Sequence, residues 1–179
     1  MLYAFGFERY GVVVSDIYFI DPSPIKGQES PEHGVRLELR LLDREKLKGS
    51  IYSAQPIGVD QPLWRVDLLE SVDGKPGSFD RTHHHPAFRG WEPGRRHFVR
   101  ELSADPLGWL QANLSDLKSV LERAGAEPDE QDDADAASLR ESVPEILDAV
   151  RRTLDKVRAG KLAVPPPGHD PGNARAGWL

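Results

Sequence analysis

The hydrophobic residues of this chain repeat with one period in its first hundred residues and with another afterwards. Apolar and charged residues alternate strictly from Val35 to Leu41, the pattern of a strand with one buried and one solvated face. From Leu107 to Leu121 leucine recurs at spacings of three and four residues, which is typical of an amphipathic helix. We therefore expect an α+β fold, with an antiparallel sheet of about five or six strands packed by two C-terminal helices.

The first half of the chain supplies the strand candidates. Residues 2–20 predict two strands around Gly11, rich in β-branched and aromatic residues. The further candidates are residues 35–41, 51–55, 63–72 and 96–102. A strong turn signal at residues 73–77 then brings the chain to its histidines.

Two helices follow. Asp105 before Pro106 is a helix start, and Gly125 marks the end of that helix. A second helix is predicted from Ser142, where Ser142 and Glu145 have capping-box spacing, to Gly160. We expect both apolar stripes to cover the sheet or pair with each other; a coiled-coil partner interface is the alternative.

Between the predicted helices lies an acidic stretch. Residues 127–145 contain eight acids and a single base, a composition typical of solvated, mobile chain. Alternatively, this loop folds back on the basic histidine segment and competes there with an anionic ligand. The expected organisation is a sheet-rich domain with the first packing helix (1–125), an acidic linker (126–141), the second helix of the same domain (142–160) and a flexible Pro/Gly-rich tail (161–179). The alternative for the final Trp178–Leu179 is that it docks on a groove of its own or of a partner chain.

Several classes of protein are excluded or disfavoured by what the sequence lacks. There is no cysteine, so disulfides, thiolate zinc sites and thiol catalysis are excluded. We find no glycine-rich phosphate loop, dinucleotide fingerprint or nucleophile elbow. The N-terminus has no signal-peptide pattern and no apolar stretch is long enough to cross a bilayer. We therefore expect a cytoplasmic protein without a membrane partner; the oligomeric state and any cofactor are left open.

The candidate site is a histidine cluster. Four of the six histidines lie between Arg81 and Arg100, where five arginines face a single acid, in a chain of formal net charge −6. If residues 80–85 are extended, His83 and His85 project to one side and His84 to the other. His97 would have to be brought to them by the fold.

Three interpretations of this cluster stay open. In the first, His83 and His85 chelate zinc, nickel or iron, with His97 and a carboxylate (Asp67, Glu70 or Asp80) completing the shell. In the second, histidines transfer protons beside arginines that hold an anion, as phosphodiester cleavage requires. In the third, the histidines only pack rings and hydrogen-bond the backbone beside Phe88 and Trp91. The second interpretation gives a catalytic set (His83, His85, His97 and Arg95) and an anion-binding pair (Arg81 and Arg96).

Residues 63–124 also resemble the TumE-type toxins of bacterial toxin–antitoxin pairs. The likeness lies in the strand Leu63–Asp67, then in Asp80–Arg81 with His83–Pro86, and then in the basic-histidine element Arg95–His97. The resemblance implies an RNA substrate, acid–base chemistry and a neutralising protein partner. The chain departs from this layout: its second element has one histidine instead of a pair, and the acidic stretch, second helix and tail are additional.

These observations predict a small intracellular protein with a His/Arg anion-binding site, RNA-cleaving or toxin-like in function. The alternatives are a non-catalytic interaction module, which uses the basic segment and the acidic linker to bind a partner, and a His-ligated metal site. Convergence of His83, His85, His97 and Arg95 in one pocket would favour an enzyme.

Overall fold

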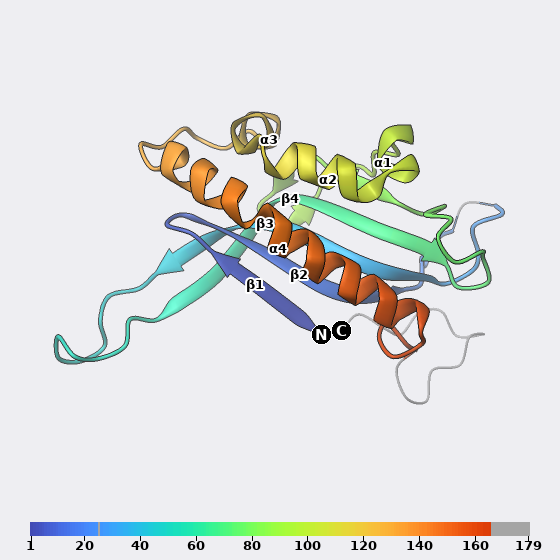
Figure 1. Ribbon diagram of the computed structural model, residues 1–179, viewed down its shortest axis with the longest axis horizontal. Helices are drawn as coiled ribbons and strands as arrows, with labels where there is room; N and C mark the ends of the chain where they lie inside the picture. Colours follow the sequence, from blue (N-terminus) through green and yellow to red (C-terminus); the bar gives the residue numbers. More distant parts are fainter. Residues whose placement is uncertain (25, 166–179) are drawn as a thin grey trace.

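A computed structural model describes residues 1–24 and 26–165, and it has the expected α+β fold. Five antiparallel strands are hydrogen-bonded in chain order, each to the next. They are β1 (Leu2–Gly6), β2 (Tyr10–Phe19), β3 (Glu32–Arg44), β4 (Ile57–Ser71) and β5 (His83–His85). A small separate hairpin follows, made of β6 (Phe88–Arg89) and β7 (Glu92–Pro93). Figure 1 shows the long β3–β4 hairpin projecting beyond the helices.

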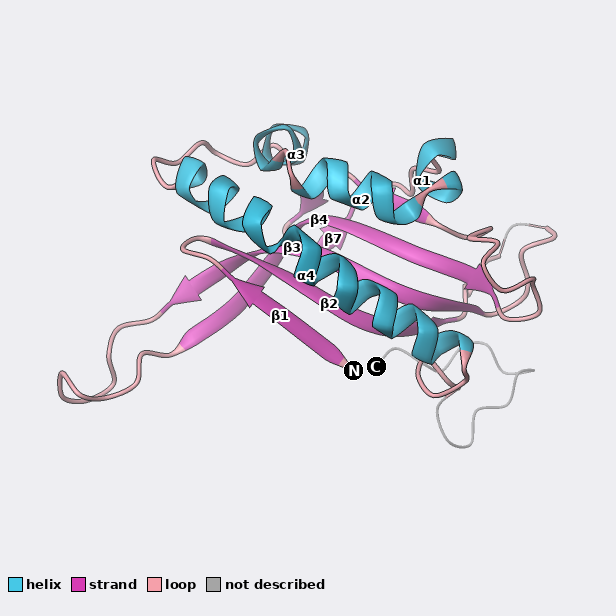
Figure 2. Cartoon of the chain, viewed as in Figure 1, coloured by secondary structure: helices cyan, strands magenta, loops and turns pink. Residues whose placement is uncertain are grey.

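The helices lie on one face of this sheet. They are α1 (Arg100–Ala104), α2 (Pro106–Leu114), α3 (Leu117–Ala124) and α4 (Asp132–Arg158). Helix α4 runs across β2 and β3, while α3 contacts β4 (Figure 2). The expectation that the helical stripes cover the sheet is confirmed.

The core lies between these two layers. The alternation from Val35 to Leu41 puts Val35, Leu37 and Leu39 there, each fully buried, because successive side chains of a strand point to opposite faces. Trp64 of β4 is also fully buried, and its ring stacks on Trp109 of α2. Ile146 and Val150 of α4 close the core from the other side.

Three strand predictions need correction. The first turn lies at residues 7–9, not at Gly11, which is within β2 and close to Leu42. Residues 51–55 form the tip of the β3–β4 hairpin, where Ile51 and Tyr52 have no second layer to pack against and are 81% and 90% exposed. Of residues 96–102, only His97 forms a strand-like bridge, and α1 begins at Arg100.

The first predicted helix is divided in two. Asp105 caps α2 as expected, accepting a hydrogen bond from the backbone N–H of Gly108. Asp116, however, leaves the helical conformation and caps α3 through the N–H of Ser119. Aspartate at this position competes for backbone donors and favours a cap over a helix interior. The leucine stripe therefore continues across a break.

The second helix begins ten residues earlier than predicted. Helix α4 starts at Asp132, so Pro144 lies inside it instead of in its first turn. The acidic linker of 126–141 is therefore mostly helix. Three aspartates occupy the first turn of α4, where negative charge is favourable to the helix dipole.

The acidic segment does not fold back on the histidines. Asp135, 1% exposed, accepts hydrogen bonds from the backbone N–H groups of Glu8, Arg9 and Tyr10 at 2.9, 2.9 and 3.1 Å. Asp132 pairs with Arg9 and accepts the Tyr10 hydroxyl. The acidic stretch thus fastens α4 to the β1–β2 turn. Most of the predicted tail, including Trp178–Leu179, lies outside the described residues.

Candidate functional site

The sheet face opposite the helices carries two rows of polar side chains across β3, β4 and β5. Strand pairing aligns Arg36, Asp67 and His83 in one row. The neighbouring row aligns Glu38, Arg65 and His85. Because residues two apart on a strand share a face, all six lie on the same side. We call this surface the polar face.

Both histidines of the polar face have the same orientation. Nδ1 of His83 donates to the carbonyl of Arg81, and Nδ1 of His85 donates to the carbonyl of Gly94, each at 2.8 Å. A carbonyl can only accept, so each Nδ1 carries a proton and each Nε2 is turned toward Asp67. The two rings meet edge to face, with centroids 5.1 Å apart. The expectation that His83 and His85 share a face is confirmed.

Asp67 lies at the centre of the polar face. It is 1% exposed and pairs with Arg36 at 2.7 Å and with Arg65 at 3.0 Å. Burial by itself would raise the pKa of this carboxyl. The contact with His83 and the two guanidinium charges outweigh burial, so the pKa of Asp67 lies well below its usual value. The carboxylate is therefore ionised.

The two imidazoles differ in their neighbours. Nε2 of His85 lies 2.9 Å from Nη2 of Arg65 and accepts its hydrogen bond, so His85 is neutral. Burial and the Arg65 charge lower the pKa of His85 from 6.5 to about 4. Nε2 of His83 lies 3.5 Å and Nε2 of His85 lies 3.7 Å from the same carboxylate oxygen of Asp67, so the contact with Arg65 is what distinguishes the two rings.

A pocket of about 640 Å³ opens over the polar face, a volume typical of small-molecule sites. The sheet supplies Asp67, both histidines, Arg36 and Arg65 to its lining. The opposite wall is the β6–β7 hairpin and the segment after it, with Trp91, Arg95 and Arg96. Hence the pocket lies between the sheet and this hairpin.

The arginines of the pocket are not equally available to a ligand. Arg36 and Arg65 pair with Asp67, and Arg96 pairs with Asp21 at 3.4 Å. Arg95 is exposed and forms no ion pair with any described residue. It is therefore the cation of the lining whose charge is not already compensated.

His97 does not belong to this site, which corrects the prediction. Its backbone pairs with His84, and the two rings are 5.6 Å apart. His84 points to the helix side of the sheet, where it packs on Trp109. Because bridged residues share a face, His97 follows His84 and not the catalytic candidates. Burial and then the neighbouring His97 lower the pKa of His84 to about 4.

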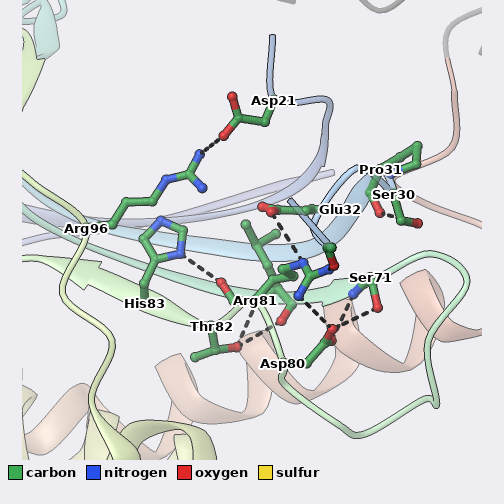
Figure 3. Close-up of polar contacts among 12 residues, drawn as sticks. Asp21, Ser30, Pro31, Glu32, Ser71, Asp80, Arg81, Thr82, His83 and Arg96 are labelled. Carbon is green, nitrogen blue, oxygen red and sulfur yellow. Dashed lines mark hydrogen bonds and ion pairs between the residues drawn. The ribbon is translucent and has the colours of Figure 1, made fainter. Parts of the chain in front are cut away.

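Arg81 is also absent from the pocket lining. Its guanidinium faces Glu32 at 3.7 Å and Asp80 at 3.3 Å, as Figure 3 shows. Its part in the site is structural, since its carbonyl orients His83. Of the predicted anion-binding pair, only Arg96 reaches the pocket.

Arg36 and Arg65 were not among the site residues expected from the sequence. A signal was present: both are charged residues at alternate positions of strands whose other face is apolar. The sequence pattern does not give the strand register, which places Arg36 beside Asp67 and Arg65 beside His85. That register is a property of paired strands, not of one segment.

The contacts of a purely structural histidine pair are present as well. His83 packs near Phe98, with ring centroids 5.4 Å apart, and His85 near Phe88 at 6.3 Å. Both rings hydrogen-bond backbone carbonyls. A structural role leaves unexplained why two histidines with fixed tautomers, a buried carboxylate and several arginines line one pocket.

Comparisons with known proteins give no family for this chain: no family model matches it, and no curated protein or solved structure matches significantly. The TumE-type resemblance, and the RNA and protein partners that it implies, stay predictions. Within the described residues, no helix combines the length and apolar character that a membrane span requires.

Proposed function

We propose that the pocket binds a phosphate ester and that His83 and His85 transfer protons during cleavage of an RNA phosphodiester. The observation that carries the proposal is the orientation of the two imidazoles. Each is fixed through Nδ1 by a backbone carbonyl, and both rings line a pocket that is also lined by arginines. Fixed tautomers and preorganised charge are what proton transfer at a phosphate requires.

The different surroundings of the two histidines give each a role. His85 is neutral and serves as the general base; His83, next to the Asp67 carboxylate, serves as the general acid. A phosphate oxygen close to Arg65 would attract its guanidinium and release Nε2 of His85. Arg95 supplies charge to the phosphate, since it forms no ion pair with a described acid, although Glu92 also lines the pocket.

In the proposed step, Nε2 of His85 accepts the proton of a ribose 2′-hydroxyl as that oxygen bonds to the adjacent phosphorus. The bond from phosphorus to the 5′-oxygen of the next nucleotide breaks, and Nε2 of His83 protonates that oxygen. The products are a 2′,3′-cyclic phosphate and a 5′-hydroxyl. Exchange with water then returns both imidazoles to their starting states.

The test uses a labelled DNA oligomer with one internal ribonucleotide, incubated with the wild-type protein and with His83→Gln and His85→Gln. We expect the wild type to cleave at the ribonucleotide and each variant to be about 10²- to 10⁴-fold slower. His97→Gln, outside the pocket, should cleave at the wild-type rate, and an all-DNA oligomer should stay intact. Cleavage that neither pocket variant slows, or no cleavage by the wild type, would contradict the proposal.

A divalent metal centre is the second candidate. Ligand atoms of Asp67, His83 and His85 all lie within 4.8 Å of one another, and the Nδ1–carbonyl bonds resemble those that orient metal-binding histidines. Against it, Arg36 and Arg65 already occupy the carboxylate and would repel a cation. Uptake of one zinc or nickel ion per chain, lost on replacing both histidines with alanine, would favour the metal over the proton-transfer pair.

A further inference from the structure

Trp91 lies at the turn of the β6–β7 hairpin, on the rim of the pocket. Gly90 precedes it with φ of +60°, a conformation that glycine adopts without strain. The indole is 61% exposed, although tryptophan has a large apolar surface to bury. An exposed ring beside an uncompensated arginine is typical of a binding surface.

One side of this ring is already occupied. The guanidinium of Arg40 lies 5.2 Å from the Trp91 ring centroid. Arg40 is itself held by Glu38 at 2.5 Å and by the carbonyl of Asp60 at 2.8 Å. The contact therefore positions the indole against the sheet and leaves its other side exposed.

The hairpin that carries Trp91 is fastened to the proposed proton acceptor. The carbonyl of Gly94 accepts a hydrogen bond from Nδ1 of His85, and the N–H of Gly94 donates to the carbonyl of Ala87. Phe88 lies under the guanidinium of Arg65, 5.7 Å from the ring centroid. The wall that carries the indole and Arg95 is thus hydrogen-bonded directly to the sheet that carries the two histidines.

We infer that the exposed side of Trp91 stacks on an unpaired nucleobase whose phosphate lies in the pocket near Arg95. The inference rests on the proposed phosphate site and adds the substrate class to it. Every base has a flat π-surface that can stack on an aromatic side chain. Proteins that bind single-stranded nucleic acid without sequence specificity combine such stacking with a positively charged groove. A base paired in a duplex has both sides covered and does not fit.

The test measures binding with an oligomer that cannot be cleaved by attack of its 2′-oxygen. A labelled eight-nucleotide 2′-O-methyl RNA is compared with an abasic oligomer of the same length and charge, by fluorescence anisotropy. We expect the wild type to prefer the oligomer with bases, and Trp91→Ala to weaken its binding about 5- to 150-fold. Binding of the abasic oligomer should not change, and Trp91→Phe should keep most of the affinity.

Tyr52→Ala is the matched control, since Tyr52 is exposed at the tip of the β3–β4 hairpin, outside the pocket lining. Equal affinity for both oligomers, or an unaffected Trp91→Ala, would overturn the stacking site while leaving the phosphate site standing. Failure of the wild type to bind either oligomer would overturn both. Competition by a mononucleotide as strong as by the oligomer would identify a free nucleotide as the source of the base.

Discussion

At the scale of single residues, the site depends on groups whose protonation the fold has fixed. His85 is 3% exposed, and its Nδ1 proton is bound by a carbonyl while Arg65 occupies Nε2. Burial followed by the Arg65 charge lowers its pKa to about 4. A histidine held in this way gives the protein a measurable dependence of stability on pH.

We predict that His85 contributes stability at neutral pH that is lost on acidification. Below pH 6.5 the unfolded chain binds a proton that folded His85 does not take up until about pH 4, so the free energy of unfolding falls across that interval. His85→Gln should remove on the order of 2 kcal/mol of the difference between pH 7 and pH 4.5. Urea unfolding at both pH values measures it; parallel pH profiles for wild type and variant would contradict the assignment.

At the scale of elements, side-chain hydrogen bonds at the helix ends set the helix boundaries that the spacing of hydrophobic residues did not define. Asp116 divides the leucine stripe by capping α3. Helix α4 passes through Pro144, although proline removes a backbone donor there. Its N-terminal end is held instead by Asp135, whose carboxylate accepts three backbone N–H groups of the β1–β2 turn.

We predict that Asp135→Ala destabilises the protein by about 3 kcal/mol, because it leaves partly buried backbone donors without their charged acceptor. The free energy of unfolding in urea is the measurement. Asp133→Ala is the matched control: this carboxylate is 79% exposed and pairs only with exposed Lys118 among the described residues, so its curve should stay near that of the wild type. Similar losses in both variants would show that the anchor has no special role.

At the scale of the whole molecule, charge is distributed unevenly. The chain has a formal net charge of −6, and two acids of α4, Asp132 and Asp135, lie at the β1–β2 turn. The segment 89–96 carries three arginines, of which Arg95 and Arg96 line the pocket. An anion would therefore be attracted locally by a protein that repels it at long range.

We predict that binding of the uncleavable single strand weakens with salt, and that Arg95→Ala lowers the slope of log affinity against log salt by about 0.7. Arg89→Ala is the matched control, since Arg89 lies on the same hairpin but outside the pocket lining. Anisotropy titrations from low to moderate salt give the slopes. The assignment of Arg95 fails if both variants change the slope equally.

The expectations that the structure confirmed rest on local sequence patterns. The change of hydrophobic period predicted an α+β chain. The alternation of side chains along a strand predicted that His83 and His85 share one face and that His84 lies on the other, because successive side chains of a strand point to opposite faces. Asp105 followed by Pro106 located the start of α2. Each of these follows from neighbours within a few residues.

The composition of the site depends on contacts between distant segments, which local patterns do not show. Arg36 and Asp67 are 31 residues apart and meet through the β3–β4 register, which is fixed by burying the apolar side of both strands at once. The bridge to His84 carries His97 to the other face, and three N–H groups of a distant turn bind Asp135. Contacts between remote segments leave no periodic pattern in the sequence. They arise when the segments pack together, so sequence periodicity does not predict them.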